Sequence, residues 1–107
     1  MEYKILNEYS NESNGTCLRG DIEISYEKLV TLFGEPFDRE GYKTDGTWVL
    51  KFSDGLIATI YNWKNGRNYL GKYGKDIKDI YHWHIGGHKD QVVQRIKAIC
   101  KGGKCNG

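Results

Sequence analysis

His82, His84 and His88 lie close together in the last third of the chain. In an extended segment, residues two positions apart share a face, so His82 and His84 could chelate a metal ion and His88 could complete the site. Three imidazole ligands with one open position are typical of catalytic zinc centres. This spacing gives one hypothesis, a metal-dependent hydrolase, although the sequence pattern places no carboxylate to orient the three rings.

Other catalytic chemistry has little support in the sequence. There is no G-x-S-x-G nucleophile motif, and the glycines of residues 66–74 lack the helix start that a phosphate loop needs. Cys100 and Cys105 have the spacing C-x₄-C, whereas a structural zinc site needs four ligands. We therefore expect a protein that is not an enzyme and that carries no cofactor. The carboxylates before residue 46 are typical of a solvated acidic loop: Glu35, Asp38 and Glu40.

A mixture of aromatic, basic and amide side chains is concentrated between residues 61 and 84. Aromatic faces stack on nucleobases and lysine or arginine neutralises phosphate, so this mixture favours a site for a nucleotide-like ligand or single-stranded nucleic acid. The alternative is that the tryptophans belong to the core and the lysines keep a loop in solution. The candidate ligand-binding residues are Tyr61, Asn62, Trp63, Lys64, Arg67, Tyr69, Lys72, Tyr73, Trp83 and His84.

A hairpin over residues 47–63, TWVLKFSDGLIATIYNW, is the element that must position these side chains. Asp54-Gly55 is typical of a two-residue type I′ turn, and the flanking runs are rich in β-branched and aromatic residues. Such a loop would pair Trp48 with Tyr61 and place one apolar stripe on the core face. That stripe would comprise Trp48, Leu50, Phe52, Ile57, Tyr61 and Trp63.

The remaining segments predict two helices and two further strands. Residues 17–24 alternate like a strand, and Ser25 would begin a helix with a period of 3.6 that ends at Gly34. Residues 77–85 predict the last strand, and residues 89–100 predict a second amphipathic helix. The order strand-helix-strand-strand-strand-helix predicts an α+β fold, with an antiparallel sheet of about four strands and both helices packed on one face.

The totals indicate one domain with two electrically opposite halves. A length of 107 residues suits a single domain over residues 1–107, with residues 1–15 and 102–107 as loose ends. No apolar run long enough to span a membrane and no signal-peptide pattern is present, so we expect no membrane partner and a cytoplasmic location. Residues 1–63 hold 6 basic and 11 acidic side chains, and residues 64–107 hold 10 and 3. Either the halves neutralise each other, or the second offers a basic face to an anionic ligand.

Resemblance to known proteins rests on three segments, GTCLRGDIEISYEKLVTLFGEP, TWVLKFSDGLIATIYNWKNG and YHWHIGGH. They resemble a group of short, mostly uncharacterised proteins encoded by bacteriophages and other viruses. The resemblance covers about residues 15–97, and the combination of YNWK with WHIGG is its most specific part. It implies a viral accessory protein in the cytoplasm of a host cell, without an assigned catalytic residue. Small phage proteins of this kind commonly counter host defence by sequestering a signalling nucleotide or by docking on a defence protein.

We therefore expect a small, virus-encoded, non-enzymatic binding protein that acts against host immunity by sequestering a nucleotide-like anionic ligand. A homo-oligomer is expected, because small ligand traps often bind at subunit junctions. An alternative is an inhibitor that docks on a host defence protein such as a nuclease, through the basic face or the acidic segment 35–45. The metal-dependent hydrolase that uses His82, His84 and His88 is the third hypothesis.

Overall fold

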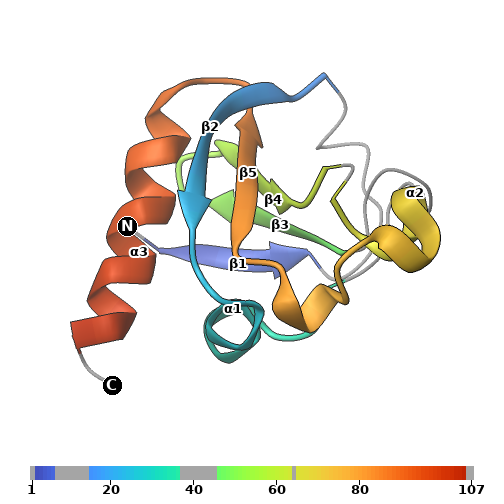
Figure 1. The fold of residues 1–107 in the computed structure, drawn as a ribbon. Coiled ribbons are helices and arrows are strands. Elements are labelled where there is room, and N and C mark those ends of the chain that lie inside the picture. The colour runs from blue at the N-terminus through green and yellow to red at the C-terminus, as the bar shows by residue number, and fades with distance from the viewer. Residues whose placement is uncertain (1, 7–14, 37–45, 64, 106–107) are drawn as a thin grey trace.

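The computed structural model describes residues 2–6, 15–36, 46–63 and 65–105 (Figure 1). Its strands are β1 (Tyr3–Leu6), β2 (Cys17–Glu23), β3 (Thr47–Phe52), β4 (Ile57–Tyr61) and β5 (His82–Gly87). Its α-helices are α1 (Tyr26–Phe33), the one-turn α2 (Arg67–Leu70) and α3 (Gln91–Cys105), and its 3₁₀ turns are η2 (Gly71–Tyr73) and η3 (Ile77–Asp79). Three predicted site or loop residues lie outside the described residues: Asp38, Glu40 and Lys64.

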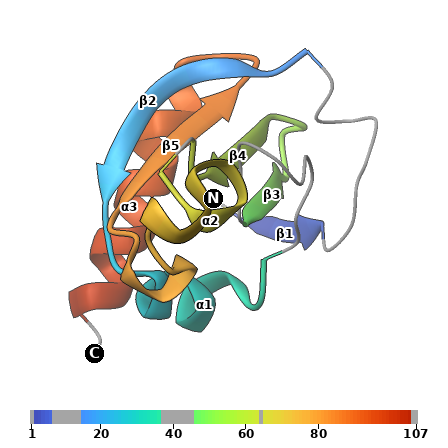
Figure 2. The same ribbon diagram turned by 45° about the vertical axis from the view of Figure 1, so that its right-hand side comes forward.

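The described strands form one antiparallel sheet in the order β1-β3-β4-β5-β2. Figure 2 shows β2 and β5 running side by side. This sheet confirms the predicted α+β class, with five strands where the sequence predicted about four. The additional strand is β1, which falls in the segment expected to be a loose end. It pairs along β3, from Tyr3 opposite Phe52 to Leu6 opposite Val49.

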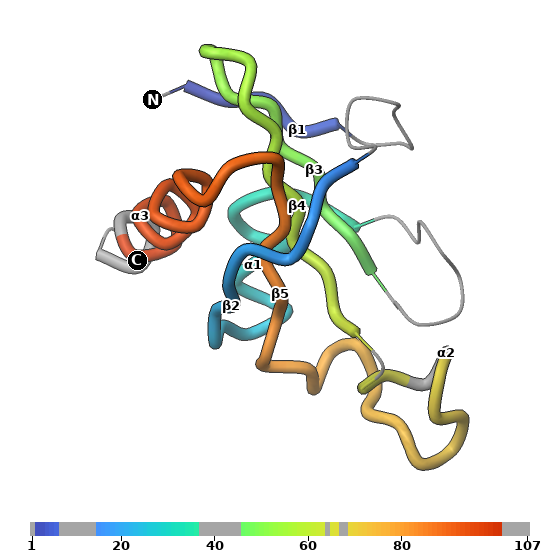
Figure 3. The backbone as a smooth tube through the Cα atoms, turned by 90° about the horizontal axis from the view of Figure 1, so that it is seen from above, coloured from blue at the N-terminus to red at the C-terminus, as the bar shows by residue number. Residues whose placement is uncertain are grey.

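The two longer helices pack against the same face of the sheet, as predicted, and Figure 3 shows α3 beside the sheet with α2 projecting away from it. α1 begins where the Ser25 hydroxyl accepts a hydrogen bond from the Lys28 backbone N–H at 3.1 Å. It ends at Gly34, whose φ of +85° favours glycine. The helix side chains buried in the shared core are Leu29 and Phe33 of α1, and Val92, Ile96 and Cys100 of α3. None of the described helices has the length and apolar content needed to span a membrane.

The β3–β4 hairpin turns at the predicted place but in a different register. The Phe52 N–H donates to the Leu56 carbonyl at 2.9 Å, and the Gly55 N–H donates to the Phe52 carbonyl at 2.9 Å. Gly55 has a φ of +92°. These features define a three-residue loop, Ser53 to Gly55, that ends in a glycine with positive φ, in place of the predicted two-residue loop.

The change of register by one residue moves every β4 side chain to the other face. Trp48 pairs with Ile60, where the two-residue loop would have paired it with Tyr61. Ala58 and Ile60 consequently lie in the core beneath the helices, and Tyr61 points to the opposite face. The predicted core stripe is therefore wrong for its β4 members and confirmed for its β3 members, Trp48, Leu50 and Phe52.

Candidate functional site

Four aromatic rings follow one another on the face of the sheet opposite the helices. In spatial order they are Trp63, Tyr61, His84 and His82, and we call them the ring row. Trp63 and Tyr61 meet edge to face with ring centroids 6.2 Å apart, Tyr61 stacks on His84 at 5.6 Å, and His84 lies 5.6 Å from His82. Trp63 is 39% exposed and the His82 side chain 52% exposed, so solvent reaches both ends of the row.

Strand pairing explains why residues far apart in the sequence meet in this row. Tyr61 of β4 lies directly opposite His84 of β5, and directly opposed side chains come into contact. His82 stands two residues along β5 and therefore shares the face of His84. Gly86, two residues in the other direction, leaves room for the tyrosine, because a Cβ there would lie 3.3 Å from Tyr61 Cε1 and 2.5 Å from Thr59 Oγ1.

The two histidines of the row have different electrostatic surroundings. His82 Nε2 lies 2.8 Å from Asp21 Oδ2, and both side chains are more than half exposed. Burial, and then the neighbouring His82, lower the pKa of His84, while Asp21 partly opposes this shift. His84 is therefore a neutral imidazole at neutral pH, with one nitrogen that donates and one that accepts. Burial, and then the nearby Cys17, raise the pKa of Tyr61, so its hydroxyl keeps the proton.

The α2–η2 segment follows the ring row in the chain and carries several of the predicted site residues. Tyr69 is 37% exposed and Tyr73 is 83% exposed. The Lys72 ammonium lies 5.3 Å from the centre of the Tyr73 ring, in a cation–π contact. Arg67 is the first residue of α2. The segment therefore presents the rings of Tyr69 and Tyr73 at the surface, with Lys72 beside one of them.

Two of the predicted ligand-binding residues hold the fold together instead. Trp83 is fully buried, and its indole N–H donates to the Ile24 carbonyl at 3.0 Å. Asn62 is also fully buried: its Oδ1 accepts from the Gly46 N–H at 3.1 Å, and its Nδ2 donates to Asn65 Oδ1 at 3.0 Å. Because strand side chains alternate, Trp83 points away from its two histidine neighbours. We therefore leave both residues out of the candidate site.

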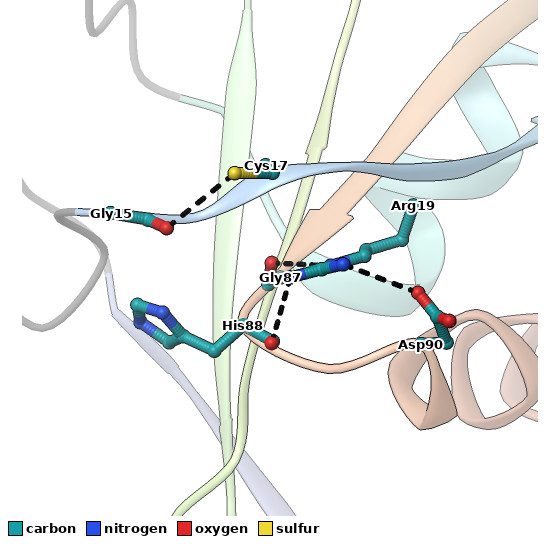
Figure 4. A network of polar contacts seen from close by, with 6 residues as sticks. All are labelled: Gly15, Cys17, Arg19, Gly87, His88 and Asp90. Atoms are coloured by element: carbon teal, nitrogen blue, oxygen red, sulfur yellow. Dashed lines mark hydrogen bonds and ion pairs between the residues drawn. The ribbon is translucent and has the colours of Figure 1, made fainter.

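His88 is separated from the other two histidines. It follows the end of β5, four residues from His84, which in a strand corresponds to roughly 13 Å. Figure 4 shows its surroundings: Arg19 donates to the His88 carbonyl at 2.8 Å and to the Gly87 carbonyl at 2.9 Å, and it pairs with Asp90 at 3.4 Å. Arg19 thus ties β2 to the turn between β5 and α3. Within the described residues, no three potential metal ligands come together, so the three-histidine hypothesis lacks a geometric basis there.

Asp21 is the site residue that the sequence reasoning missed. The alternation of β2 assigns it to the polar face, but its neighbours depend on how β2 pairs. β2 pairs with β5, and this puts Asp21 directly opposite His84 and within hydrogen-bond distance of His82. The sequence did show acidic residues in one predicted strand and histidines in another. Their pairing could be predicted only if the order of the strands in the sheet were known.

The fold and the site together define an α+β domain with a ring row on the sheet face opposite its helices. No family model and no curated protein sequence matches this chain. Its function is therefore inferred from the ring row and the groups around it.

Proposed function

We propose that this protein is a non-enzymatic binding protein that sequesters a nucleotide-like anionic ligand at the ring row. The observation that carries the proposal is the row itself, four rings of which each lies beside the next, with a partly exposed tryptophan at one end. Antiparallel sheets that present aromatic side chains are recurrent platforms for nucleobases. Stacking of a base on an aromatic side chain contributes roughly 1–3 kcal/mol.

The polar edges of the row suit a base better than an aliphatic ligand. The neutral His84 ring offers both a donor and an acceptor, and the protonated Tyr61 hydroxyl offers the same pair of functions. Base edges carry donors and acceptors side by side, so these two groups complement them. Trp63 then supplies the stacking surface, and its exposure leaves that surface accessible.

Charge around the row sets the direction in which such a ligand would lie. Asp21 stands at the His82 end, where its carboxylate repels phosphate. Lys72 and Lys75 are exposed on the segment that follows the Trp63 end. We therefore place the base at the centre of the row and the phosphate towards these lysines.

The resemblance to phage-encoded proteins supplies the biological setting of the proposal. It implies that the ligand is a signalling nucleotide of a host defence system and that the protein acts in the host cytoplasm. A homo-oligomer belongs to the same proposal, because a second copy would help to enclose a ligand that lies on an open sheet face.

A second candidate function is docking on a host defence protein. Tyr69, Leu70 and Tyr73 are 37%, 41% and 83% exposed on the α2–η2 segment. Adjacent exposed apolar side chains of this kind, with a lysine among them, are typical of protein-binding surfaces. This surface and the ring row can be separated by mutation.

Tryptophan fluorescence tests the proposal, because Trp63 is the exposed tryptophan, whereas Trp48 and Trp83 are 1% and 0% exposed. Titration with a panel of cyclic and linear nucleotides should quench the Trp63 emission. Native mass spectrometry of the same samples should report a bound nucleotide and the oligomeric state. Failure of the whole panel to bind at micromolar concentration would refute the proposal.

Calorimetry with matched variants locates the site. Trp63→Ala should raise the Kd of the bound nucleotide roughly 10- to 100-fold, since it removes one stacking contact. Leu70→Ala removes an exposed side chain that lies outside the row and is not among the predicted ligand-binding residues, so it should bind the nucleotide like the wild type. It should weaken binding of a partner protein if docking is the function. Unchanged nucleotide affinity in Trp63→Ala would place the site elsewhere.

A further inference from the structure

A groove distinct from the ring row lies where the end of β2, the start of α1 and the C-terminal half of α3 meet. Its volume is about 520 Å³, within the range of small-ligand sites. Ile22 and Ile24 give it apolar surface, and Tyr81, which is 56% exposed, gives it an aromatic face. Three lysines from two helices also line it: Lys28, Lys97 and Lys101.

Across the described part of the chain, none of these three lysines makes an ion pair or donates a hydrogen bond through its ammonium. Lys97 and Lys101 lie four residues apart on one helix, an arrangement in which like charges destabilise the helix. Glu23 is the one carboxylate among the described lining residues, so the groove keeps a net positive charge.

Lys28 lies near Cys100, which also lines the groove and is 5% exposed. Burial raises the pKa of the Cys100 thiol to about 11, and the nearby Lys28 ammonium opposes this rise. The thiol therefore stays neutral at physiological pH, so it does not offset the positive charge of Lys28.

We propose that this groove binds the phosphate chain of a nucleoside polyphosphate, at a second site that goes beyond the ring-row function. Lysine ammonium groups form strong charge-assisted hydrogen bonds with phosphoryl oxygens. Tyr81 offers a surface on which the base can stack, and the isoleucines take the less polar parts of the nucleoside. The bound phosphates would relieve the repulsion between Lys97 and Lys101.

Nuclear magnetic resonance of the full chain distinguishes this site from the ring row in a single titration. The Trp83 indole N–H donates to the carbonyl of Ile24, a residue of the groove, whereas Trp63 belongs to the ring row. With ATP as the probe, we expect shifts of the Trp83 indole signal and of the backbone amides of residues 22–28 and 97–101. Tripolyphosphate should produce shifts at the same amides with weaker affinity than ATP, because it lacks the base that contacts Tyr81.

Paired variants test the lysines. Lys97→Gln with Lys101→Gln should weaken ATP binding roughly tenfold or more, since each removes a charged hydrogen-bond donor. Lys4→Gln with Lys89→Gln removes the same charge at exposed positions outside the groove, and it should bind like the wild type. The affinity of the wild type should also fall as salt concentration rises.

Three results would overturn the groove proposal. They are the absence of shifts at millimolar ATP, shifts confined to the ring row, and equal losses in the two paired variants. Equal affinities for ATP and tripolyphosphate would overturn the part assigned to Tyr81. Trp63→Ala changes the ring row only, so ATP should shift the groove signals of this variant as it does those of the wild type. The groove proposal can therefore hold even if the ring-row proposal fails.

Discussion

Gly86 and Gly87 at the end of β5 offer a test of how closely both faces of the sheet are packed. Successive strand residues point to opposite faces, so alanine at position 86 enters the ring-row side and alanine at position 87 enters the helix side. The Gly87 Cβ would lie 2.6 Å from Val92 Cγ2 and 2.9 Å from the carbonyl oxygen of Ile57. The Gly86 Cβ would meet a hydroxyl, that of Thr59, at 2.5 Å. Both substitutions therefore force neighbouring atoms to move.

The free-energy cost differs because the obstacles differ. Overpacking a well-packed interior costs about 1–3 kcal/mol, and replacing glycine returns about 0.4–1 kcal/mol by restricting the unfolded chain. Only the Thr59 hydroxyl lies closer than 3 Å to the Gly86 Cβ, so Gly86→Ala should lower the free energy of unfolding by about 1 kcal/mol. The Gly87 Cβ meets both a side chain of α3 and a backbone carbonyl of β4 closer than 3 Å, so Gly87→Ala should lower the free energy of unfolding by about 2 kcal/mol.

Urea denaturation followed by tryptophan fluorescence measures both effects. In a Thr59→Ala background the cost of Gly86→Ala should shrink, because the obstructing hydroxyl is gone. Gly86→Ala should also weaken nucleotide binding, since its methyl group presses on the Tyr61 ring, whereas Gly87→Ala should leave the affinity of the folded fraction unchanged. Wild-type stability in both variants would show that β5 does not approach β4 and α3 as closely as the structure indicates.

Three further predictions follow from single contacts. His82→Gln should raise the pKa of His84, measured by NMR titration, because it removes a neighbouring charge that lowers it; an unchanged pKa would contradict this coupling. Arg95 holds the pKa of Asp54 below its usual value through hydrogen bonds of 2.9 and 2.7 Å. The wild type should therefore be more stable than Arg95→Gln at neutral pH, and this difference should disappear as pH falls below about 4 and the carboxylate is protonated. Ile96→Ala should cost about 2–5 kcal/mol in thermal or urea unfolding, because the side chain is fully buried, and a smaller loss would mean that the core collapses around the cavity.

Elements with local chemical signals were predictable from the sequence. Ser25 and Gly34 mark the limits of α1, because a hydroxyl cap and a positive φ are properties of single residues. The last strand was less predictable: residues 77–79 form a 3₁₀ turn, and β5 runs from His82 to Gly87. Gly86 and Gly87, which follow the predicted end of this strand at residue 85, lie within it, because close approach of neighbouring elements needs glycine there.

The charged residues were also only partly predictable. The sequence composition shows that the two halves of the chain carry opposite charge, but it does not show which acidic side chain pairs with which basic one. Asp54 pairs with Arg95 across 41 residues, and Asp21 pairs with His82 across 61 residues. Such pairs depend on strand order and on the placement of α3. The same topology gathers the three groove lysines from two helices, so composition alone could not locate that groove.

The position of the ring row depends on the loop of the β3–β4 hairpin. The β4 sequence IATIY has apolar residues on both faces, so hydrophobic patterning allows either register. The positive φ of Gly55 completes a three-residue loop that begins with Ser53. With a two-residue loop, Tyr61 would lie beside Trp48 beneath the helices, and no ring would stand opposite His84 on the other face. Turn chemistry, and not the hydrophobic pattern, therefore places Tyr61 where the proposed ligand site needs it.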